Sequence, residues 1–405
     1  MRGIGMFRSI GCVAAMTVLV PMVLVASSDP SSAAEAKGAP IPVVIIGAIS
    51  SPAFSVPEQV GGADAAAKAI NASGGINGRP IEVQSCNDMG TPNLSTSCAE
   101  KAVSSGDVAV VGTLSIGGTQ ILPVLQSGGV ADIGPDPVSP IEFTSPNSFP
   151  VQCGTLCQDE GEVQILESHG VKTVSIPYEG DAAGEAALPL YANAAKKLGV
   201  KVVSEVSIPP TATDLSTYVS EINAGKPEGI ILDVEASQTA LFLSGFSSVG
   251  STAKIAASAP LVPQSVLDSL NGAANGAYLG DTMPPTYSNI KTDVDFRQDM
   301  KKYSPGSLVD GFSENSWMAV ELFAKVASGL KTVNAKSVLS AMDSVKDLNF
   351  LYLHNYTPSK GLALSGYNRV AVPLLWFDYV KGGKLTLGSE NAQNMTSLLG
   401  GTKAS

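Results

Sequence analysis

The chain of 405 residues contains few of the side chains from which catalytic and metal sites are built. It has two histidines, His169 and His354, and five cysteines. Neither histidine pairs with a convincing serine, cysteine or metal cluster, no G-x-S-x-G motif occurs, and the cysteine spacing is not that of a zinc site. The numerous carboxylates leave room for a glycosidase pair, but no motif points to one. We therefore expect no enzyme, no cofactor and no metal.

Charged and aromatic residues are also scarce, at 15% and 6% of the chain. The charge that exists is mostly negative, with 36 Asp and Glu against 25 Lys and Arg, which gives a formal net charge of −11. This balance argues against nucleic acid and against an anionic membrane surface as partners. The length favours two lobes over a single core.

Long apolar runs are limited to one segment near the start of the chain, Val13–Val25, which follows Arg2 and Arg8. Its 13 residues are too few to span a bilayer comfortably, and small residues follow it. We expect an export signal in residues 1–34, cleaved between 26 and 36, and an extracytoplasmic protein of the periplasm, cell envelope or medium. An uncleaved membrane anchor is the alternative.

Four cysteines remain after this segment, and we expect them to form two disulfides in an exported chain. Sequence allows three pairings. Cys86–Cys98 and Cys153–Cys157 close the shortest loops and are the pairing that we favour. Cys12 precedes the apolar segment, so we do not expect it to be a lipidation site.

Apolar runs and amphipathic stretches alternate along the chain from about residue 40. This alternation predicts an α/β fold with two doubly wound units around parallel sheets. We expect strands in the first unit at 43–49, 81–85, 108–112 and 131–133, and in the second at 173–177, 201–208, 229–233 and 254–257. We expect later helices at 160–168, 293–303, 314–328 and 335–343, and a strand at 369–379.

The segment Ile70–Val83, which reads INASGGINGRPIEV, links the first predicted helix to the second strand. It resembles the start of the type I periplasmic binding proteins, in the Leu/Ile/Val-binding branch. The resemblance implies two lobes, 40–150 plus 283–365 and 151–280 plus 366–405, joined by a three-stranded hinge. It also implies a monomer that captures a small polar or amphipathic organic solute and docks on an ABC transporter permease.

Loops after the strands are the candidate solute site, because ligands of open parallel sheets bind beyond the carboxyl ends of strands. Ser115 and Asp136 have competing structural roles, as a helix cap and a turn residue. We select the polar residues and one glycine of these loops as candidates for ligand binding: Ser50, Ser51, Ser115, Gly117, Asp136, Tyr178 and Glu235.

The resemblance also predicts selectivity. In an ungapped alignment, the serine that grips an amino-acid carboxylate in the family falls on Ile116, and its threonine falls on Val138. The acid that pairs with the ammonium falls near Ala259 and Pro260. We therefore expect weak or no binding of leucine, isoleucine and valine. A sensing protein for a membrane receptor is the second hypothesis for the function, and an exported hydrolase is the third.

Overall fold

The computed structural model describes residues 36–51, 55–362, 367–389 and 391–400. The predicted export signal and its cleavage region up to residue 35 lie outside these residues. Within the described part of the chain, no helix has both the length and the apolar character needed to cross a membrane.

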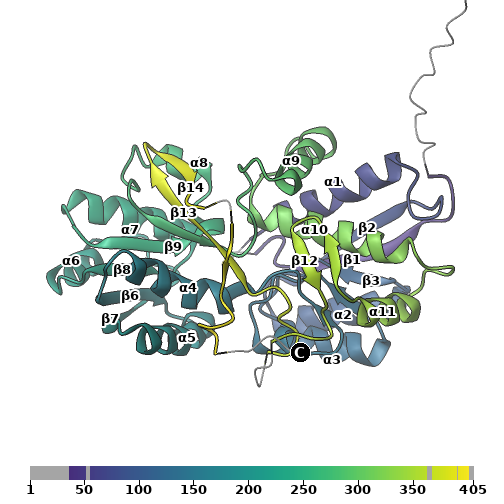
Figure 1. The fold of residues 1–405 in the computed structure, drawn as a ribbon, viewed down its shortest axis with the longest axis horizontal. Coiled ribbons are helices and arrows are strands. Elements are labelled where there is room, and N and C mark those ends of the chain that lie inside the picture. The colour runs from purple at the N-terminus through teal and green to yellow at the C-terminus, as the bar shows by residue number, and fades with distance from the viewer. Residues whose placement is uncertain (1–35, 52–54, 363–366, 390, 401–405) are drawn as a thin grey trace, which may run out of the picture. The chain divides into compact units, whose positions relative to one another are not determined.

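The first sheet is entirely parallel, with the strand order β2-β1-β3-β4-β5. Figure 1 labels β1, β2 and β3 of this sheet. Ile41, Val43 and Ile45 belong to one apolar core and Val44 and Ile46 to another, because successive side chains of a strand point to opposite faces. Its strands are β1 (Ile41–Gly47), β2 (Ile81–Asn87), β3 (Ala109–Val111), β4 (Ala131–Ile133) and β5 (Ser148–Phe149).

Helices cover both faces of this sheet. The core that contains Val44 and Ile46 is completed by α2 (Pro92–Ser105) and α3 (Gly118–Gly128). The opposite core is built on α1 (Glu58–Ala72) and on three later helices and a hairpin, which return to this sheet from the C-terminal part of the chain. These later elements are α9 (Lys291–Tyr303), α10 (Gly311–Ala327), α11 (Ala335–Ser344), β11 (Leu348–Phe350) and β12 (Leu353–Tyr356).

The second sheet has the order β14-β13-β10-β9-β8-β6-β7, and β15 pairs with β13. The strands from β6 to β10 are parallel, whereas β13 runs antiparallel to β10. The strands are β6 (Thr173–Glu179), β7 (Lys201–Ile208), β8 (Gly229–Leu232), β9 (Lys254–Ser258), β10 (Tyr278–Asp281), β13 (Leu374–Lys381), β14 (Lys384–Leu387) and β15 (Gln393–Asn394). The helices are α4 (Gly154–Ser168), α5 (Ala182–Leu198), α6 (Ser216–Ala224), α7 (Ala236–Ser248) and α8 (Gln264–Ser269).

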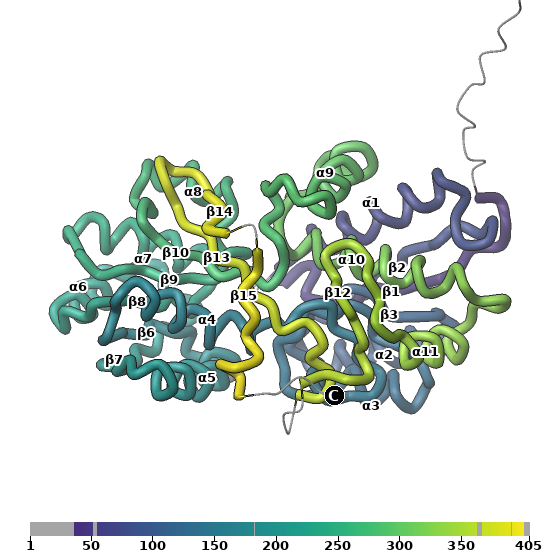
Figure 2. Tube along the Cα trace, in the orientation of Figure 1, coloured from purple at the N-terminus to yellow at the C-terminus, as the bar shows by residue number. Residues whose placement is uncertain are grey.

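The chain passes between the elements of the two sheets three times, and Figure 2 traces its path. It leaves the first sheet between β5 and α4, returns between β10 and α9, and leaves again between β12 and β13. The architecture is the predicted one, two doubly wound units with parallel central strands. The lobe limits given above stay a prediction at the level of single residues.

Two predicted elements begin five or more residues away from their predicted start. Helix α4 starts at Gly154, not near residue 160. The disulfide joins Cys153 to Cys157, four residues on, and this spacing is about one turn of a helix, so the bridge fits a first turn that is already helical. Strand β13 starts at Leu374 instead of residue 369, directly after Pro373, which has no N–H to donate to a neighbouring strand. The β11–β12 hairpin has no counterpart among the predicted elements.

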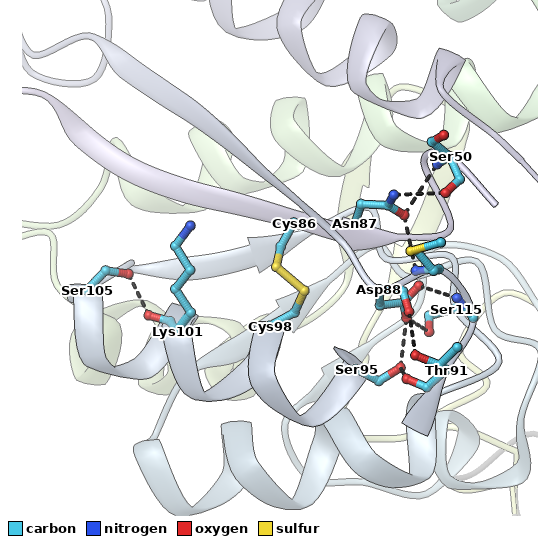
Figure 3. Close-up of a disulfide and its surroundings, with 12 residues drawn as sticks. Ser50, Cys86, Asn87, Asp88, Thr91, Ser95, Cys98, Lys101, Ser105 and Ser115 are labelled. Atoms are coloured by element: carbon cyan, nitrogen blue, oxygen red, sulfur yellow. Dashed lines mark hydrogen bonds between the residues drawn. A yellow bond between two sulfur atoms is a disulfide. The ribbon is translucent and has the colours of Figure 1, made fainter. Parts of the chain in front are cut away.

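Both favoured disulfides are present, Cys86–Cys98 and Cys153–Cys157. The first joins the carboxyl end of β2 to α2 (Figure 3). It lies beside the polar loops that follow β1, β2 and β3, so it holds α2 against the edge of the sheet that carries these loops.

Replacing Cys86 and Cys98 together by alanine is expected to lower the free energy of unfolding by about 3 kcal/mol. The disulfide spans a sequence separation of 12 and restricts the unfolded chain, and the chain-entropy model gives this value for such a loop. Urea unfolding of the oxidised protein and the double variant measures the difference. Equal stability of the two proteins, or a Cys98–Cys153 peptide in non-reducing mapping, would contradict this account.

Candidate functional site

The loop after β3 is held from below by a buried carboxylate, Asp88 (Figure 3). The hydroxyl of Ser115 donates to this carboxylate and accepts a hydrogen bond from the backbone N–H of Gly117 at 2.9 Å. Ser95 donates to the same carboxylate at 2.9 Å. Ser115 is 3% exposed, and its hydroxyl hydrogen is committed to the hydrogen bond with Asp88. Its observed role is therefore to shape the loop.

Gly117 is required by close packing in this loop. A Cβ atom at this position would lie 2.0 Å from the hydroxyl oxygen of Ser95. The neighbouring Ile116 is 62% exposed, so the loop presents an apolar side chain to solvent at the position where the ungapped alignment predicts the family's carboxylate-binding serine.

Ser50 is fixed through its backbone. Asn87, the last residue of β2, donates from its amide to the carbonyl of Ser50 at 2.9 Å and accepts from its N–H at 3.3 Å. The loops after β1 and β2 are thus tied together, and Figure 3 shows Ser50 in the same group of loops as Ser115. Ser51 follows Ser50 in the loop after β1.

Two buried carboxylates lie beneath the loops that follow β3 and β4. Asp132 accepts a hydrogen bond from the hydroxyl of Thr113 at 2.8 Å. Glu142, in the short helix Pro140–Phe143, accepts from the N–H groups of Val138 and Ser139 at 3.0 and 2.8 Å. Burial raises the pKa of Asp132 to about 7 and that of Glu142 to about 8, and the charge of Asp132 adds to the shift of Glu142.

Asp136 belongs to a network that reaches two of the three crossings between the sheets. Burial raises its pKa to about 7, and a hydrogen bond from Gln152 opposes that shift. Gln152 lies before α4, donates to Asn315 of α10 at 2.8 Å and accepts from Thr282, which follows β10. Asn315 in turn donates to the carbonyl of Gly134 at 3.0 Å. A change at Asp136 can therefore reach the crossing segments through one intervening side chain.

The second sheet carries four acidic residues at the carboxyl ends of β6 and β8 and in the loops that follow, which we call the acidic rim: Glu179, Asp181, Asp233 and Glu235. Backbone hydrogen bonds from Glu179 to Asp233 (2.8 Å) and from Asp233 to Pro177 (3.0 Å) tie the two loops together. Burial, and then the neighbouring carboxylates, raise the pKa of Asp233 and of Glu235 to about 7. No Lys or Arg among the described residues forms an ion pair with the rim.

Individual roles within the rim differ. Asp181 is the N-cap of α5 and accepts from the N–H groups of Ala183 and Gly184 at 2.9 and 3.0 Å. Tyr178 is half-buried and packs against the second sheet's apolar core. Glu235 is partly buried at the start of α7 and has no cap hydrogen bond from its side chain. Of the two predicted candidates on the second sheet, Tyr178 and Glu235, only Glu235 carries a carboxylate, and the backbone N–H of Ala236 donates to it.

Sequence reasoning missed a group of acids under this rim. Asp159 and Glu162 project from α4 and are buried, and the hydroxyl of Tyr191 donates to Glu162 at 3.1 Å. Burial and the charge of Asp233 raise the pKa of both carboxyls. Their i, i+3 spacing was a usable signal, but the helix was predicted to begin too late to include Asp159. No group of three or more His, Cys, Asp and Glu in the described part of the chain is arranged to hold a metal ion.

A cavity of about 360 Å³ lies where β10, β13, β14 and the segment before α10 meet. It is lined by residues that sequence reasoning did not select, among them Asp281, Tyr287, Arg297, Asp378 and Lys384. A larger depression of about 560 Å³ lies at the amino ends of β8 and β9, lined by residues such as Lys226 and Glu228, away from every candidate loop.

The comparisons with known proteins agree with this architecture. A family model described as periplasmic binding protein matches residues 40–372. The chain therefore belongs to the periplasmic binding proteins, of type I and of the Leu/Ile/Val-binding family, as the motif after the first helix indicated. The proteins of this family are extracytoplasmic solute-binding proteins.

A curated relative is the Leu/Ile/Val-binding protein homolog 3 of Brucella melitensis, 28% identical over 203 residues, which are 48% of this chain and 54% of that protein. The chain thus spans about half the length of the curated relatives that it matches.

Two solved structures are similar in fold. The fatty acid ABC transporter substrate-binding protein of Thermomonospora curvata has a TM-score of 0.77 at 16% identity, over 93% of this chain and 98% of that one. A solute-binding protein of an R. palustris ABC transporter, in complex with 4-hydroxybenzoate, has a TM-score of 0.72 at 17% identity, over 88% and 97%. At these identities the likeness shows the fold alone.

Proposed function

We propose that the chain is the extracytoplasmic solute-binding protein of an ABC uptake transporter. It is exported, acts as a monomer, binds a small polar or amphipathic organic molecule between its two lobes, and delivers it to a membrane permease. The observation that carries this proposal is the family match over residues 40–372, in a chain with polar loops after the strands of both sheets.

Closure of the lobes requires a solute that binds the closed form better than the open one. Asp136 follows a strand of the first sheet and Glu235 follows a strand of the second. A solute held by both makes its second contact only on closure. The network from Asp136 through Gln152 to Thr282 would then couple solute binding to the crossing segments that bend.

We also propose that leucine, isoleucine and valine bind weakly. The exposed side chain of Ile116 stands where an amino-acid carboxylate would need a hydroxyl, and Ala259 and Pro260 offer no carboxylate to an ammonium group. The missing charge-assisted hydrogen bond is worth about 1.5–3 kcal/mol.

Substitution of Asp136 by Asn or Glu235 by Gln is expected to weaken solute binding at least about tenfold, since each removes a charged acceptor. A solute is first identified as a compound that raises the melting temperature of the wild-type protein, in a panel of amino acids, aromatic carboxylates, fatty acids and amines. Calorimetry then measures the affinity of each variant for this solute. Neither variant should lower the melting temperature of the free protein.

The matched control is Glu205→Gln, which removes one charge from an exposed position on β7. Ser115→Ala is expected to loosen the loop over Asp88, with a lower melting temperature. If the Asp136 and Glu235 variants both bind as tightly as the control, these loops do not hold the solute. A leucine affinity in the submicromolar range would overturn the selectivity proposal.

A further inference from the structure

The chain contains three Asn-Gly pairs, and the structure describes all of them: Asn77-Gly78, Asn271-Gly272 and Asn275-Gly276. An asparagine before a glycine is prone to deamidation, because glycine has no Cβ atom that would shield its backbone nitrogen or restrict its approach to the preceding side chain. All three asparagines are exposed. Exposure therefore does not distinguish the pairs, whereas the hydrogen bonds around them do.

Deamidation needs only water besides the chain itself. The backbone nitrogen of the glycine attacks Cγ of the asparagine and gives up its proton. The bond between Cγ and Nδ2 breaks, and Nδ2 leaves with that proton as ammonia, so that a five-membered succinimide ring remains. Water then opens the ring at either carbonyl carbon, which gives aspartate or isoaspartate. The ring fixes a backbone conformation different from that of a tight turn, so the turn must open before the nitrogen reaches Cγ.

Two of the pairs occupy the same kind of turn. The backbone angle φ is 52° at Asn77 and 81° at Gly78, and it is 47° at Asn271 and 83° at Gly272. Positive φ at both central residues is typical of a type I′ turn, in which Asn-Gly is the favoured pair. The same reacting groups thus occur in matching backbone conformations, and a difference in rate between them must come from their surroundings.

The Asn77 turn is held on both sides and through its side chain. Ile76 and Arg79 exchange backbone hydrogen bonds in both directions, at 2.9 and 3.0 Å. Nδ2 of Asn77 donates to the carbonyl of Leu330 at 3.2 Å, which ties the leaving group to the segment after α10. Attack in this turn therefore requires that the two backbone bonds and the side-chain bond all be broken.

The Asn275 pair is held by the β13–β14 hairpin. The N–H of Gly276, which is the attacking nitrogen, donates to the carbonyl of Val380 on β13 at 2.9 Å. Oδ1 of Asn275 accepts from the N–H of Gly383, in the turn between β13 and β14, at 2.8 Å. Both the nucleophile and the side chain that it would attack are thus fixed to the hairpin.

Asn271 lacks these restraints. One backbone hydrogen bond closes its turn, from the N–H of Ala273 to the carbonyl of Leu270 at 2.9 Å. The side chain of Asn271 forms no hydrogen bond with any residue that the structure describes, and the N–H of Gly272 donates to none of them. Opening of this turn therefore breaks fewer contacts than opening of the Asn77 turn, and the reacting side chain is already free to rotate.

We propose that Asn271 is a site of spontaneous deamidation in the folded protein, and that the fold protects Asn77 and Asn275. The isoaspartyl product would place a methylene group in the main chain of the turn between α8 and β10, and β10 is the strand before the second crossing. The inference does not depend on the proposed function, since the reaction involves only this turn and water.

Peptide mapping by mass spectrometry tests the proposal on the full mature protein, kept folded in mildly alkaline buffer and sampled over time. We expect Asn271 to convert at least about tenfold faster than Asn77 or Asn275, because the extra hydrogen bonds lower the open population of their turns. A parallel sample in guanidinium chloride supplies the control. There the three pairs should react within about twofold of one another, since the fold no longer distinguishes them.

A variant separates Asn271 from its neighbour Asn275, which lies on the same peptide. Asn271→Gly keeps the turn, because glycine adopts positive φ readily, and it removes the amide that reacts. In the folded variant this peptide should show no aspartate or isoaspartate beyond the slow background at Asn275. Conversion in isotopically labelled water should introduce one labelled oxygen at Asn271 of the wild type, as opening of a succinimide requires.

The proposal is overturned if Asn77 or Asn275 converts as fast as Asn271 in the folded protein, or if Asn271 converts only in guanidinium chloride. It is also overturned if the peptide of the folded Asn271→Gly variant converts at the wild-type rate, because the reacting residue would then be Asn275. None of these results depends on a solute, so failure here leaves the proposed solute-binding function untouched.

Discussion

Raising the pH from about 5 to about 8 is expected to destabilise the ligand-free protein, which is the reverse of the usual behaviour of paired carboxylates. The reason lies in buried acids whose folded pKa exceeds the unfolded value near 4. Asp132, with a folded pKa of about 7, and Glu142, with about 8, lie beneath the loops after β3 and β4. Between the unfolded and folded pKa values the folded chain keeps a proton that the unfolded chain has lost. Stability therefore falls as the pH rises through this window, by up to about 1.4 kcal/mol per pH unit for each group.

Urea unfolding across this pH range measures the effect. The double variant Asp132→Asn, Glu142→Gln should have a flatter profile, because its two amides do not titrate, and it should be the more stable protein at about pH 8. Glu205→Gln, exposed on β7, should keep the wild-type slope. Stability that rises steadily toward pH 8 in the wild type would show that these carboxyls are ionised in the folded protein, contrary to their burial.

Replacing Gly62 by alanine is expected to lower the free energy of unfolding by about 3 kcal/mol or more. Gly62 lies in α1 where this helix touches α10 backbone to backbone. A Cβ atom would lie 1.9 Å from the carbonyl oxygen of Ser313 and 2.6 Å from the hydroxyl oxygen of Ser316. That hydroxyl donates to the carbonyl of Gln59 at 2.6 Å, so the methyl group would also break a hydrogen bond between the helices.

Gly306→Ala provides the control. Gly306 is exposed, its φ is not in the left-handed region, and nothing lies within 4 Å of a Cβ at that position. It should leave stability unchanged or raise it by about 0.5 kcal/mol, because the unfolded chain loses freedom. Chemical denaturation measures the free energy of unfolding of the wild type and of both variants. Loss of the same small amount in the two proteins would mean that α1 and α10 can separate at no cost.

The order of elements could be predicted from the sequence because buried parallel strands appear as short apolar runs such as Val43–Ile46. The starts of α4 and β13 at the crossings were less predictable. The Cys153–Cys157 disulfide lies in the first turn of α4, and Pro373, which has no N–H, directly precedes β13. The site was harder still. Asp132 lies within a three-residue strand, and nothing in its neighbours indicates that its carboxylate is buried against Thr113.

The residues that line the 360 Å³ cavity could not be grouped from the sequence at all. Asp281 and Asp378 are brought together by the antiparallel pairing of β10 with β13, in which Leu279 is opposite Asp378 and Asp281 is opposite Trp376. Ser115 illustrates the opposite error. Its position in a loop after a strand was predicted correctly, but only the structure shows the buried carboxylate of Asp88, which accepts the hydrogen bond from its hydroxyl.

The most direct test of the central claim, that this chain captures a small solute between its lobes, is native mass spectrometry of protein purified without refolding. The account predicts one small organic molecule bound per chain, released on denaturation, and retained less by the Asp136→Asn and Glu235→Gln variants than by Glu205→Gln. A wild-type protein that carries no solute, and that gains none from the solute panel under native conditions, would contradict it.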